Sequence, residues 1–371
     1  MNKIKVLQVN KMYYPVTGGV ERVVQQIAEG LNDRTDMKVL VCQKKGRGMV
    51  ENVNGVEVHK ASSLGVAFST PISFSFFRQL RVLRKDRDIL HIHMPFPLAD
   101  VALWLYGFKG KIALWWHADI VKQKKLLLLY KPFMTWLLRR ADCIMTATQG
   151  HIDDSSFLQP YQDKCVIIPF GVDKALFEKS DQLTAKPRKN GEPLRFLFVG
   201  RLIYYKGCEY LLEAMAKVEG ATLTIIGEGP LEQSLREQAR RLRIDRRVEF
   251  RGSVDDNALA QAFADCDVFV LPSIAKTEAF ALVQIEAMAY GKPVINTSLP
   301  SGVPHVSPDD ITGLTVPPED SDALATAMQK LVDDADLRER FGKAAYARAR
   351  EEYPMDKMLD RIYNEYERLL K

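Results

Sequence analysis

Short apolar runs alternate with amphipathic stretches along the chain, in two successive series. In the first series, runs of mostly apolar and often β-branched residues predict buried parallel strands. They are residues 4–9, 37–42, 88–93, 111–116, 142–148 and 164–170. Between these runs apolar residues recur at helical spacing, most clearly over residues 20–32 and 75–85. Strict alternation of strand and helix predicts a doubly wound parallel sheet of the α/β class.

The second half of the chain repeats the pattern. Its predicted strands are residues 194–200, 221–227, 246–252, 266–273 and 292–298. A polar stretch with Pro and Gly, residues 180–193, separates the two series. Because 371 residues exceed what one hydrophobic core normally supports, we expect an N-terminal Rossmann-like domain over residues 1–171 and a C-terminal domain over residues 172–354. Pro354 interrupts the last helical stretch, and we expect the helix at 355–371 to cross back onto the first domain.

This class of fold also predicts where a ligand binds. Ligands of open α/β sheets bind outside the carboxyl ends of the strands. If the two domains face each other with these ends, the site lies in a central cleft between them. Residues that directly follow predicted strands are therefore the first candidates for binding and chemistry.

Composition and charge narrow the class of protein. A content of 47% hydrophobic and 27% charged residues is typical of an ordinary globular chain. The net charge of +5 is too small and too dispersed to predict a nucleic-acid partner, which needs a concentrated basic face. The five cysteines form no CxxC pair, which argues against a disulfide framework or a thiolate zinc site and suits a reducing cytosol. The apolar run at 101–108 is shorter than the about 20 residues that span a bilayer, so we expect a soluble chain.

Two strand ends carry candidate anion-binding groups. Gly18 and Gly19 follow the first predicted strand and open a helix, where backbone N–H groups and the helix dipole favour an anion. A plain tight turn is an equally good interpretation of an isolated Gly-Gly. In the second domain, Arg201 and Lys206 follow the first strand, and a guanidinium and an ammonium at one strand end suit a pyrophosphate. The alternative is a solvated loop with two incidental charges.

Two glutamates form a further candidate constellation. Glu278 and Glu286 are eight residues apart, so we expect both carboxylates on one helical face, about 12 Å from each other. One carboxylate could hold sugar hydroxyls and the other a ribose, with the helix N-terminus between them for phosphate. The alternative is that Glu278 only stabilises the helix dipole. The apolar surroundings of Glu286, within residues 285–291, argue against a merely solvated charge.

His117 directly follows the strand predicted at 111–116. An imidazole at this strand end could donate to a leaving phosphate or to a substrate hydroxyl, and Asp119 could orient or contact the acceptor. His91 and His93 alternate onto one face of the preceding strand. Because no third ligand is evident, we interpret them as a buried or cleft-lining pair and not as a metal site.

Two Asp-x-Asp triplets, residues 86–88 and 265–267, could in principle bind a divalent ion. Both precede a predicted strand, which places them at the end opposite to the expected cleft. We therefore interpret them as helix-to-strand turns and predict no metal.

A Rossmann oxidoreductase is a remote alternative. Gly227, Gly229 and Asp245 mimic part of the dinucleotide-binding fingerprint after the strand at 221–227. Glu232 occupies the position of the third glycine, however, where a bulky charged residue obstructs close helix–strand packing. A third class, a non-catalytic sugar- or nucleotide-binding module, would not need His117 together with the glutamate pair.

These motifs, in this order, resemble the retaining glycosyltransferases of the GT-B fold, family 4, over essentially the whole chain. The segments HADIVKQKK (117–125), YQDK (161–164), VIIPFG (166–171) and YYKG (204–207) resemble more closely the bacterial mannosyltransferases that build O-antigen or exopolysaccharide from GDP-mannose. Those enzymes transfer mannose to a lipid-pyrophosphate-linked sugar. The resemblance implies a nucleotide-sugar donor, a lipid-linked saccharide acceptor and no cofactor. A UDP-linked hexose or N-acetylhexosamine stays open as the alternative donor.

The resemblance also implies roles for individual residues. The implied donor-binding set is Gly18, Gly19, Arg201, Lys206, Gly227, Ala279, Phe280, Ala281, Leu282 and Glu286, and the implied catalytic set is His117, Asp119 and Glu278. Within these sets Arg201 and Lys206 neutralise the diphosphate, Glu278 holds the donor sugar and Glu286 holds the ribose. Ala281 stands where many family members have Gly. The backbone N–H survives this change, whereas the room beside the sugar is expected to shrink.

A basic and apolar segment in the first domain suggests contact with a membrane. Residues 121–140 carry six basic and no acidic residues, and residues 77–87 add a second basic strip. An ordinary amphipathic core helix is the alternative to a surface that docks on anionic lipid. We favour docking and expect a cytoplasmic protein on the inner face of the cytoplasmic membrane. The basic residues expected to contact lipid or acceptor are Lys122, Lys124, Lys125, Lys131, Arg139 and Arg140.

Overall fold

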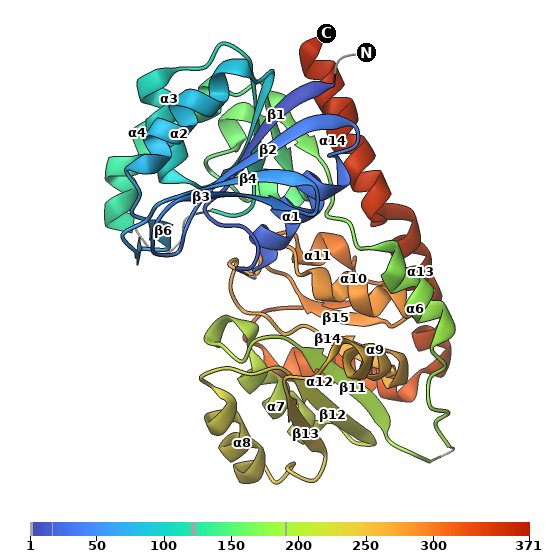
Figure 1. Ribbon diagram of the computed structural model, residues 1–371. Helices are drawn as coiled ribbons and strands as arrows, with labels where there is room; N and C mark the ends of the chain where they lie inside the picture. The colour runs from blue at the N-terminus through green and yellow to red at the C-terminus, as the bar shows by residue number, and fades with distance from the viewer. Residues whose placement is uncertain (1–2, 17, 120–123, 190) are drawn as a thin grey trace. The chain divides into compact units, whose positions relative to one another are not determined.

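The computed structural model describes residues 3–16, 18–119, 124–189 and 191–371, except for the side chains of residues 124–126. The chain divides into two compact units (Figure 1). The first unit comprises Met1–Pro169 and Met358–Lys371, and the second comprises Phe170–Lys357.

The first unit is built on an eight-stranded sheet with the order β10-β9-β8-β7-β1-β2-β4-β3. Its parallel strands are β1 (Ile4–Val9), β2 (Thr35–Cys42), β4 (Val56–Ala61), β7 (Ile89–Met94), β8 (Lys111–Trp116), β9 (Cys143–Thr146) and β10 (Cys165–Ile167). All six strands predicted for this half are present. Five of them are mostly buried, because helices cover both faces of a parallel sheet, whereas β10 at the sheet edge is half-buried or exposed.

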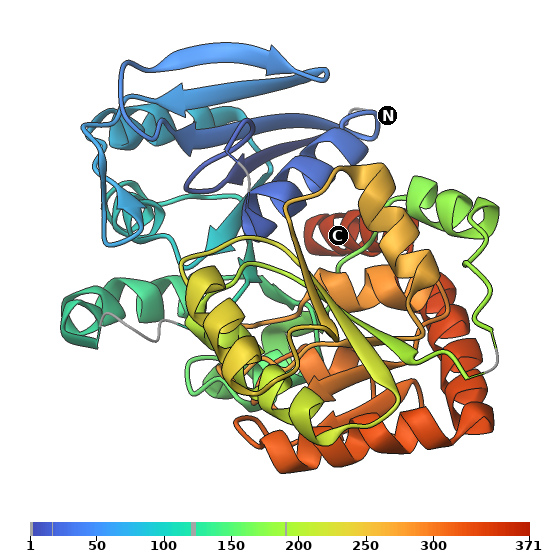
Figure 2. The same cartoon turned by 90° about the horizontal axis from the view of Figure 1, so that it is seen from below.

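The β3–β4 hairpin escaped the sequence prediction. Strand β3 (Met49–Val53) pairs antiparallel with β4 at the edge of the sheet, where Figure 2 shows the two strands as the outermost pair. Asn54 and Gly55 have φ of 49° and 88° and form the turn. Asn-Gly is a strong hairpin signal, but β3 is exposed or half-buried throughout and therefore lacks the apolar run that marked the other strands.

Helices cover the sheet of the first unit. They are α1 (Gly19–Gly30), α2 (Ser75–Leu83), α3 (Pro97–Tyr106), α4 (Lys124–Arg140), α5 (Gln149–Asp153), α14 (Met355–Leu370) and the 3₁₀ turns η1 (Arg84–Asp86) and η2 (Gln159–Lys164). One core joins α2, α3 and α4 to the sheet through side chains such as Phe76, Leu103 and Met134. Helix α14 packs elsewhere on the sheet, since Tyr366 reaches His91 of β7 and Leu359 lies against Gly30 of α1.

The second unit has a six-stranded parallel sheet with the order β13-β12-β11-β14-β15-β16. Its strands are β11 (Leu194–Val199), β12 (Ala221–Ile226), β13 (Val248–Gly252), β14 (Val268–Val270), β15 (Val294–Thr297) and β16 (Gly313–Val316). The first five were predicted. Strand β16 was missed because it has four residues and begins with Gly313, which resembles a turn signal in the sequence. The glycine is required there, since a Cβ atom would lie 1.7 Å from the Val294 carbonyl oxygen.

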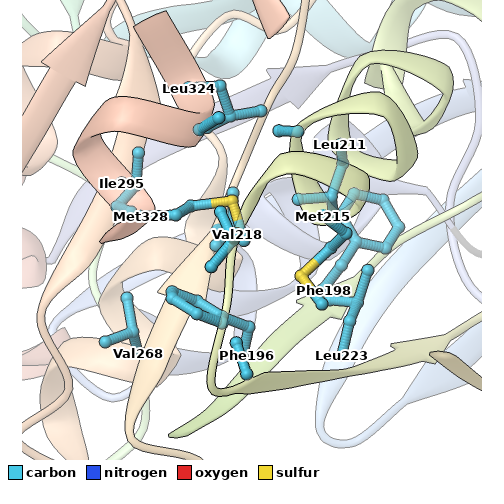
Figure 3. Close-up of a cluster of buried hydrophobic side chains, with 14 of the residues drawn as sticks. Phe196, Phe198, Leu211, Met215, Val218, Leu223, Val268, Ile295, Leu324 and Met328 are labelled. Atoms are coloured by element: carbon cyan, nitrogen blue, oxygen red, sulfur yellow. The ribbon is translucent and has the colours of Figure 1, made fainter. Parts of the chain in front are cut away.

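The helices of the second unit enclose a well-packed core. They are α6 (Lys174–Gln182), α7 (Cys208–Lys217), α8 (Glu232–Arg241), α9 (Asp256–Asp265), α10 (Leu282–Ala289), α11 (Val303–Val306), α12 (Ser321–Asp333), α13 (Ala335–Glu352) and the 3₁₀ turn η3 (Tyr204–Lys206). Figure 3 shows Phe196 of β11 and Val268 of β14 packed beneath Met215 of α7 and Met328 of α12. Each fully buried side chain of this size contributes about 1.5–3 kcal/mol, so the core holds the strand ends in fixed positions.

The strand order reverses once in each sheet, and this places the candidate loops. The reversal lies between β1 and β7 in the first unit and between β11 and β14 in the second. Ligands of doubly wound sheets bind beside such a reversal. The predicted class, two Rossmann-like doubly wound sheets, is thus confirmed, and the loops after these strands carry the candidate residues.

Candidate functional site

A buried ion pair lies at the strand reversal of the second unit. Lys206, in the loop after β11, is 8% exposed, and its ammonium lies 2.5 Å from the carboxylate of Glu278 in the loop after β14. The hydroxyl of Ser273 donates to the same carboxylate oxygen at 3.0 Å. Arg201 leaves the same strand end but is exposed. The structure therefore brings Lys206 and Glu278 into direct contact, which their separation of 72 residues in the sequence did not indicate.

The backbones of the two loops hold this pair together. The Ile274 N–H donates to the Tyr205 carbonyl at 2.8 Å, and the Thr297 hydroxyl donates to the Ser273 carbonyl at 2.5 Å. Gly207 has φ of 64°, and a Cβ atom on it would lie 2.1 Å from the Pro272 carbonyl oxygen. A residue with a side chain at this position would push the loops, and with them the ion pair, apart.

The Gly207→Ala variant is therefore expected to be less stable than the matched Gly220→Ala variant by about 1–3 kcal/mol, the usual cost of overpacking. Both glycines have φ of 64°, but at Gly220 the nearest atom to an added Cβ is 3.7 Å away. The shared backbone strain cancels in the comparison, which leaves the clash with Pro272. Calorimetric unfolding of the two variants measures the difference, and equal melting temperatures would contradict the close approach of the loops.

The prediction that Glu278 and Glu286 share one helical face is wrong. Helix α10 begins at Leu282, and the preceding Ala281 is left-handed, with φ of 61° and ψ of 75°. A residue in this conformation cannot continue a right-handed helix, so Glu278 lies outside it, in a turn in which its N–H donates to the Ala275 carbonyl. Glu286 lies within α10 and is half-buried. Burial and, second, the charge of Glu286 raise the pKa of Tyr290.

The left-handed conformation makes the presence of Ala instead of Gly at position 281 unfavourable. A positive φ favours Gly, so Ala at this position carries backbone strain of order 1–2 kcal/mol. The neighbouring Phe280 is buried and stacks edge-on against Phe170 at 4.9 Å. The Ala279 carbonyl accepts from the Gly302 N–H at 2.7 Å. In this segment the Phe280 side chain and the Ala279 carbonyl support the loop, whereas Leu282 begins the helix.

Gly227 and Gly229 serve loop packing, which accounts for the apparent dinucleotide fingerprint. A Cβ atom on Gly227 would lie 2.0 Å from the Gly200 carbonyl oxygen, and one on Gly229 would lie 2.3 Å from that of Leu202. The loops after β11 and β12 therefore touch along their backbones. This contact keeps Gly200 and Leu202, and the Arg201 between them, in place.

Three histidines form a stack in the first unit. His117 follows β8, and its Nε2 lies 2.8 Å from Nδ1 of His93 on β7. The ring of His93 stacks on His91 at 4.7 Å and on His117 at 5.1 Å, and Trp115 stacks with all three rings. Strands β7 and β8 are neighbours in the sheet, so the sequence-distant rings meet. The interpretation of His91 and His93 as a buried pair fits this arrangement.

The histidines are neutral. Burial lowers the pKa of His91 and of His117 to about 3, and it lowers the pKa of His93 well below its usual range. The neighbouring His151 and Lys11 are further causes of the lowered pKa of His117. At neutral pH the His117 ring is therefore uncharged and can form hydrogen bonds.

Asp119 has a structural role. Its Oδ1 atom accepts from the Trp116 indole N–H at 3.1 Å and from the Ser155 hydroxyl at 2.7 Å. These bonds tie the loop after β8 to the segment after α5. The Oδ1 atom of Asp119 thus holds the loop, and the contact of Asp119 with the acceptor stays a prediction.

The Gly-Gly segment opens α1, and an acidic side chain lies against it. Gly18 is extended, with φ of −172°, and precedes the first helical residue, Gly19. The Glu21 carboxylate oxygen lies 2.2 Å from the position that a Cβ atom of Gly18 would take, whereas nothing lies within 4 Å of that position on Gly19. A carboxylate at this helix end interacts favourably with the dipole. A bound diphosphate would have to displace or share this place with Glu21.

Both Asp-x-Asp triplets lie at helix-to-strand turns, as predicted. Asp88 accepts from the Lys5 N–H at 2.8 Å, and the Asp267 carboxylate binds the Arg195 guanidinium at 3.1 Å. Asp86 ends η1 and Asp265 ends α9. Within the described part of the chain, no three His, Cys, Asp or Glu side chains are grouped so as to hold a metal ion.

Both units match models of known glycosyltransferase families. Residues 17–176 match the model of Glycosyltransferase Family 4, and residues 179–348 match that of Glycosyl transferases group 1. O-antigen chain mannosyltransferase C of Escherichia coli is 32% identical, with 99% of each chain covered. The D-rhamnosyltransferase WbpZ of Pseudomonas aeruginosa is 33% identical, with 94% of this chain and 92% of the relative covered.

The solved structures agree on the fold. The crystal structure of Anabaena Alr3699/HepE in complex with UDP superposes with a TM-score of 0.76, at 18% identity, over 98% of this chain and 99% of that chain. At this identity the likeness concerns the fold alone, which is of the GT-B type.

Proposed function

Because this chain belongs to family 4 of the GT-B glycosyltransferases, we propose that it moves mannose from GDP-mannose onto a lipid-linked saccharide during the synthesis of a surface polysaccharide. The choice of sugar is supported by the relative that is 32% identical along the whole chain, an O-antigen chain mannosyltransferase. The motifs HADIVKQKK and YYKG support the same donor and acceptor classes.

The buried pair of Lys206 and Glu278 carries the proposal. An ammonium and a carboxylate that already neutralise each other can exchange partners with a ligand that brings both an anion and hydroxyl groups, which describes a nucleotide sugar. In this scheme Lys206 and the exposed Arg201 bind the diphosphate, and Glu278 accepts hydrogen bonds from the sugar hydroxyls. The position beside the strand reversal of the second sheet is where such folds bind ligands.

The transfer proceeds with retention of the anomeric configuration, by a same-face mechanism. Glu278 is not the nucleophile in this scheme, because its carboxylate exchanges Lys206 for the hydroxyl groups of the donor sugar. The diphosphate departs from the face on which the acceptor hydroxyl attacks, and the departing phosphate accepts the proton of that hydroxyl. The positive charge that develops on the sugar is stabilised electrostatically, without a covalent bond to the protein.

Donor screening tests the proposal. Hydrolysis and transfer are measured with GDP-mannose, GDP-D-rhamnose, UDP-glucose and UDP-N-acetylglucosamine, and proton NMR of the product reports the anomer. We expect turnover with GDP-mannose and a retained anomer. Turnover with a UDP donor alone would overturn the donor, an inverted anomer would overturn the mechanism, and no turnover with any donor would overturn the enzymatic role.

D-rhamnose transfer is the second candidate. It is favoured by the 33% identity to a D-rhamnosyltransferase over 94% of this chain. D-Rhamnose is mannose without the 6-hydroxyl group, so one site can accept both sugars. A preference for GDP-D-rhamnose over GDP-mannose in the same screen would select this alternative.

Activity is expected to persist in EDTA. Arg201, Lys206 and the N-terminus of α10 supply the positive charge for the departing diphosphate in this proposal, so a divalent ion is not needed. The measurement is the transfer rate before and after chelation. A loss of activity that magnesium or manganese restores would contradict the prediction.

We also propose that the first unit docks on anionic lipid through α4. Leu128 and Leu129 are each 75% exposed, and the basic Lys131 and Arg139 are exposed on the same helix. Arg140 is left out of this surface, because its guanidinium binds the Asp142 carboxylate and two backbone carbonyls. Lys122 lies outside the described residues, as do the side chains of Lys124 and Lys125. Of the helices in the described ranges, none combines the length and apolar content that crossing a bilayer requires.

The Leu128→Asp/Leu129→Asp variant is expected to bind vesicles of phosphatidylglycerol at least tenfold more weakly than the unchanged protein, because each insertion of a Leu side chain is worth about 1.5–3 kcal/mol. Met49 and Val50 of β3 are 46% and 59% exposed in the same unit, so Met49→Asp/Val50→Asp is the matched control. Vesicle co-sedimentation measures binding. Equal loss in both variants, or equal binding to phosphatidylcholine, would contradict docking through α4.

A further inference from the structure

His117 belongs to a buried hydrogen-bonded chain of side chains that begins at Gln8 on β1. The amide nitrogen of Gln8 lies 2.8 Å from Nε2 of His93, and Nδ1 of His93 lies 2.8 Å from Nε2 of His117. Gln8 is 0% exposed, His93 1% and His117 8%. The chain runs across the neighbouring strands β1 and β7 to the end of β8, beside the strand reversal of the first sheet.

The chemistry of these groups gives the chain a direction. A carboxamide nitrogen only donates, so Nε2 of His93 accepts from Gln8. Both rings are neutral, because burial lowers the pKa of His93 well below its usual range and that of His117 to about 3. A neutral ring carries one proton, so His93 carries it on Nδ1 and donates to Nε2 of His117. His117 then carries its own proton on Nδ1.

We propose that Gln8 and His93 are positioning residues that hold His117 in its Nδ1–H tautomer, so that His117 meets its substrate as a hydrogen-bond donor and not as a base. The assignment of a sugar substrate to His117 rests on the proposed function, whereas the tautomer does not. His93 and Gln8 touch no substrate themselves and act through the His117 ring.

The orientation of the Gln8 carboxamide sets the direction of the whole chain. With its oxygen toward His93, each bond would reverse, and His117 would expose a lone pair at Nδ1. In the observed orientation Oε1 of Gln8 is buried and finds no partner among the described residues. The reverse orientation would place two N–H donors at that buried position without an acceptor, and orphaned donors are rarer in proteins than orphaned acceptors.

His91 offers a matched control, because it belongs to the stack but not to the chain. It stacks on His93 at 4.7 Å, and its Nδ1 lies 2.5 Å from the Tyr366 hydroxyl of α14. It is as fully buried as His93. A change at His91 disturbs ring packing, whereas a change at His93 disturbs packing and also removes the donor to His117.

Nitrogen-15 NMR of the donor-free protein tests the tautomer directly, since protonated and bare ring nitrogens have separate chemical shifts. The chain has six histidines, so the signals of His117 are assigned by their loss in His117→Gln. We expect a protonated Nδ1 and a bare Nε2 on His117. A bare Nδ1 overturns the proposal, whatever the enzymatic activity of the protein.

Substitution at His93 tests the positioning role. In His93→Leu, His117 loses its donor, and we expect its signals to shift toward a mixture with the Nε2–H tautomer. His93→Asn places a carboxamide nitrogen near the position of Nδ1 and should restore the original tautomer. His91→Leu should leave it unchanged. If His93→Leu does not fold, Gln8→Leu replaces it with the same expectation, and an unchanged tautomer in the variant that folds overturns the proposal.

Kinetics separates this inference from the proposed function. We expect His93→Leu to lower kcat about tenfold, the worth of one hydrogen bond to substrate, with GDP affinity unchanged and recovery in His93→Asn. A chain without turnover on any donor defeats the proposed function but leaves the NMR result intact. An altered tautomer with unchanged kcat overturns the functional part of the inference.

Discussion

Replacing Lys206 with Ala is expected to weaken GDP binding by about 10- to 150-fold, which corresponds to the roughly 1.5–3 kcal/mol of a charge-assisted hydrogen bond. Lys206 is 8% exposed, and its ammonium lies 2.5 Å from the Glu278 carboxylate. Without the ammonium this carboxylate stays buried without its counter-ion, beside the place proposed for the diphosphate. Repulsion therefore adds to the lost contact. Titration calorimetry with GDP measures the effect.

Two further variants make the test specific. Arg201→Ala should also weaken GDP binding, because a guanidinium binds a phosphate through two parallel hydrogen bonds. Lys217→Ala is the control, since Lys217 lies in the same unit and forms an exposed ion pair with Asp322 at 2.6 Å. It should leave the affinity unchanged. GDP and UDP affinities that stay unchanged in both Arg201→Ala and Lys206→Ala would remove the diphosphate assignment.

A double variant tests the coupling of the buried pair. In Lys206→Ala/Glu278→Gln the uncompensated carboxylate is gone, so GDP should bind more tightly than to Lys206→Ala alone. Residues in direct contact show such non-additivity, whereas independent residues do not. Additive effects in the four-membered cycle would mean that the contact between Lys206 and Glu278 does not govern donor affinity.

Most strands were predictable from the sequence because their signal is local. An apolar run of four to eight residues between polar turns is enough to mark a buried strand, and the ends of these strands give the positions of the candidate loops. The two Asp-x-Asp triplets were placed correctly for the same reason, since each directly precedes such a run. Strand β3 was missed because it is not buried, β4 because polar residues alternate with its apolar ones, and β16 because it begins with a glycine.

The contacts within the candidate site were not predictable, because they depend on strand order. Lys206 meets Glu278 since β11 and β14 are neighbours at the reversal, and His117 meets His93 since β8 lies beside β7. The local pattern of apolar and polar residues does not show which strands are neighbours in a sheet. The prediction that Glu278 and Glu286 share a helical face failed for a different reason. Their spacing suits a helix, but the left-handed Ala281 keeps Glu278 outside the helix that begins at Leu282. The departure from Gly at Ala281 was visible in the sequence and was the one signal of an unusual backbone there.

The Glu278→Gln variant is expected to lose about 10²–10³-fold in kcat, the usual cost of removing one group that stabilises developing charge. Its GDP affinity should stay equal or rise. The carboxamide keeps the shape of the side chain but cannot neutralise Lys206, so the whole charge of the ammonium becomes available to the diphosphate. A fall in kcat without a loss of GDP affinity distinguishes this role from a structural one, which would weaken binding and turnover together.

His117→Ala should likewise lower kcat with little effect on GDP affinity, because His117 is neutral and belongs to the first unit, whereas Arg201 and Lys206, which bind the diphosphate in this proposal, belong to the second. Single-turnover kinetics and calorimetry on the same preparation separate the two quantities.

Mass spectrometry of donor-treated protein completes the test, because the same-face mechanism forms no bond between sugar and protein. A glycosyl adduct trapped on any Asp or Glu, in the unchanged protein or in Glu278→Gln, would replace this mechanism with a double displacement. A fall in GDP affinity as large as the fall in kcat would instead show that Glu278 supports the loop and does not act on the sugar.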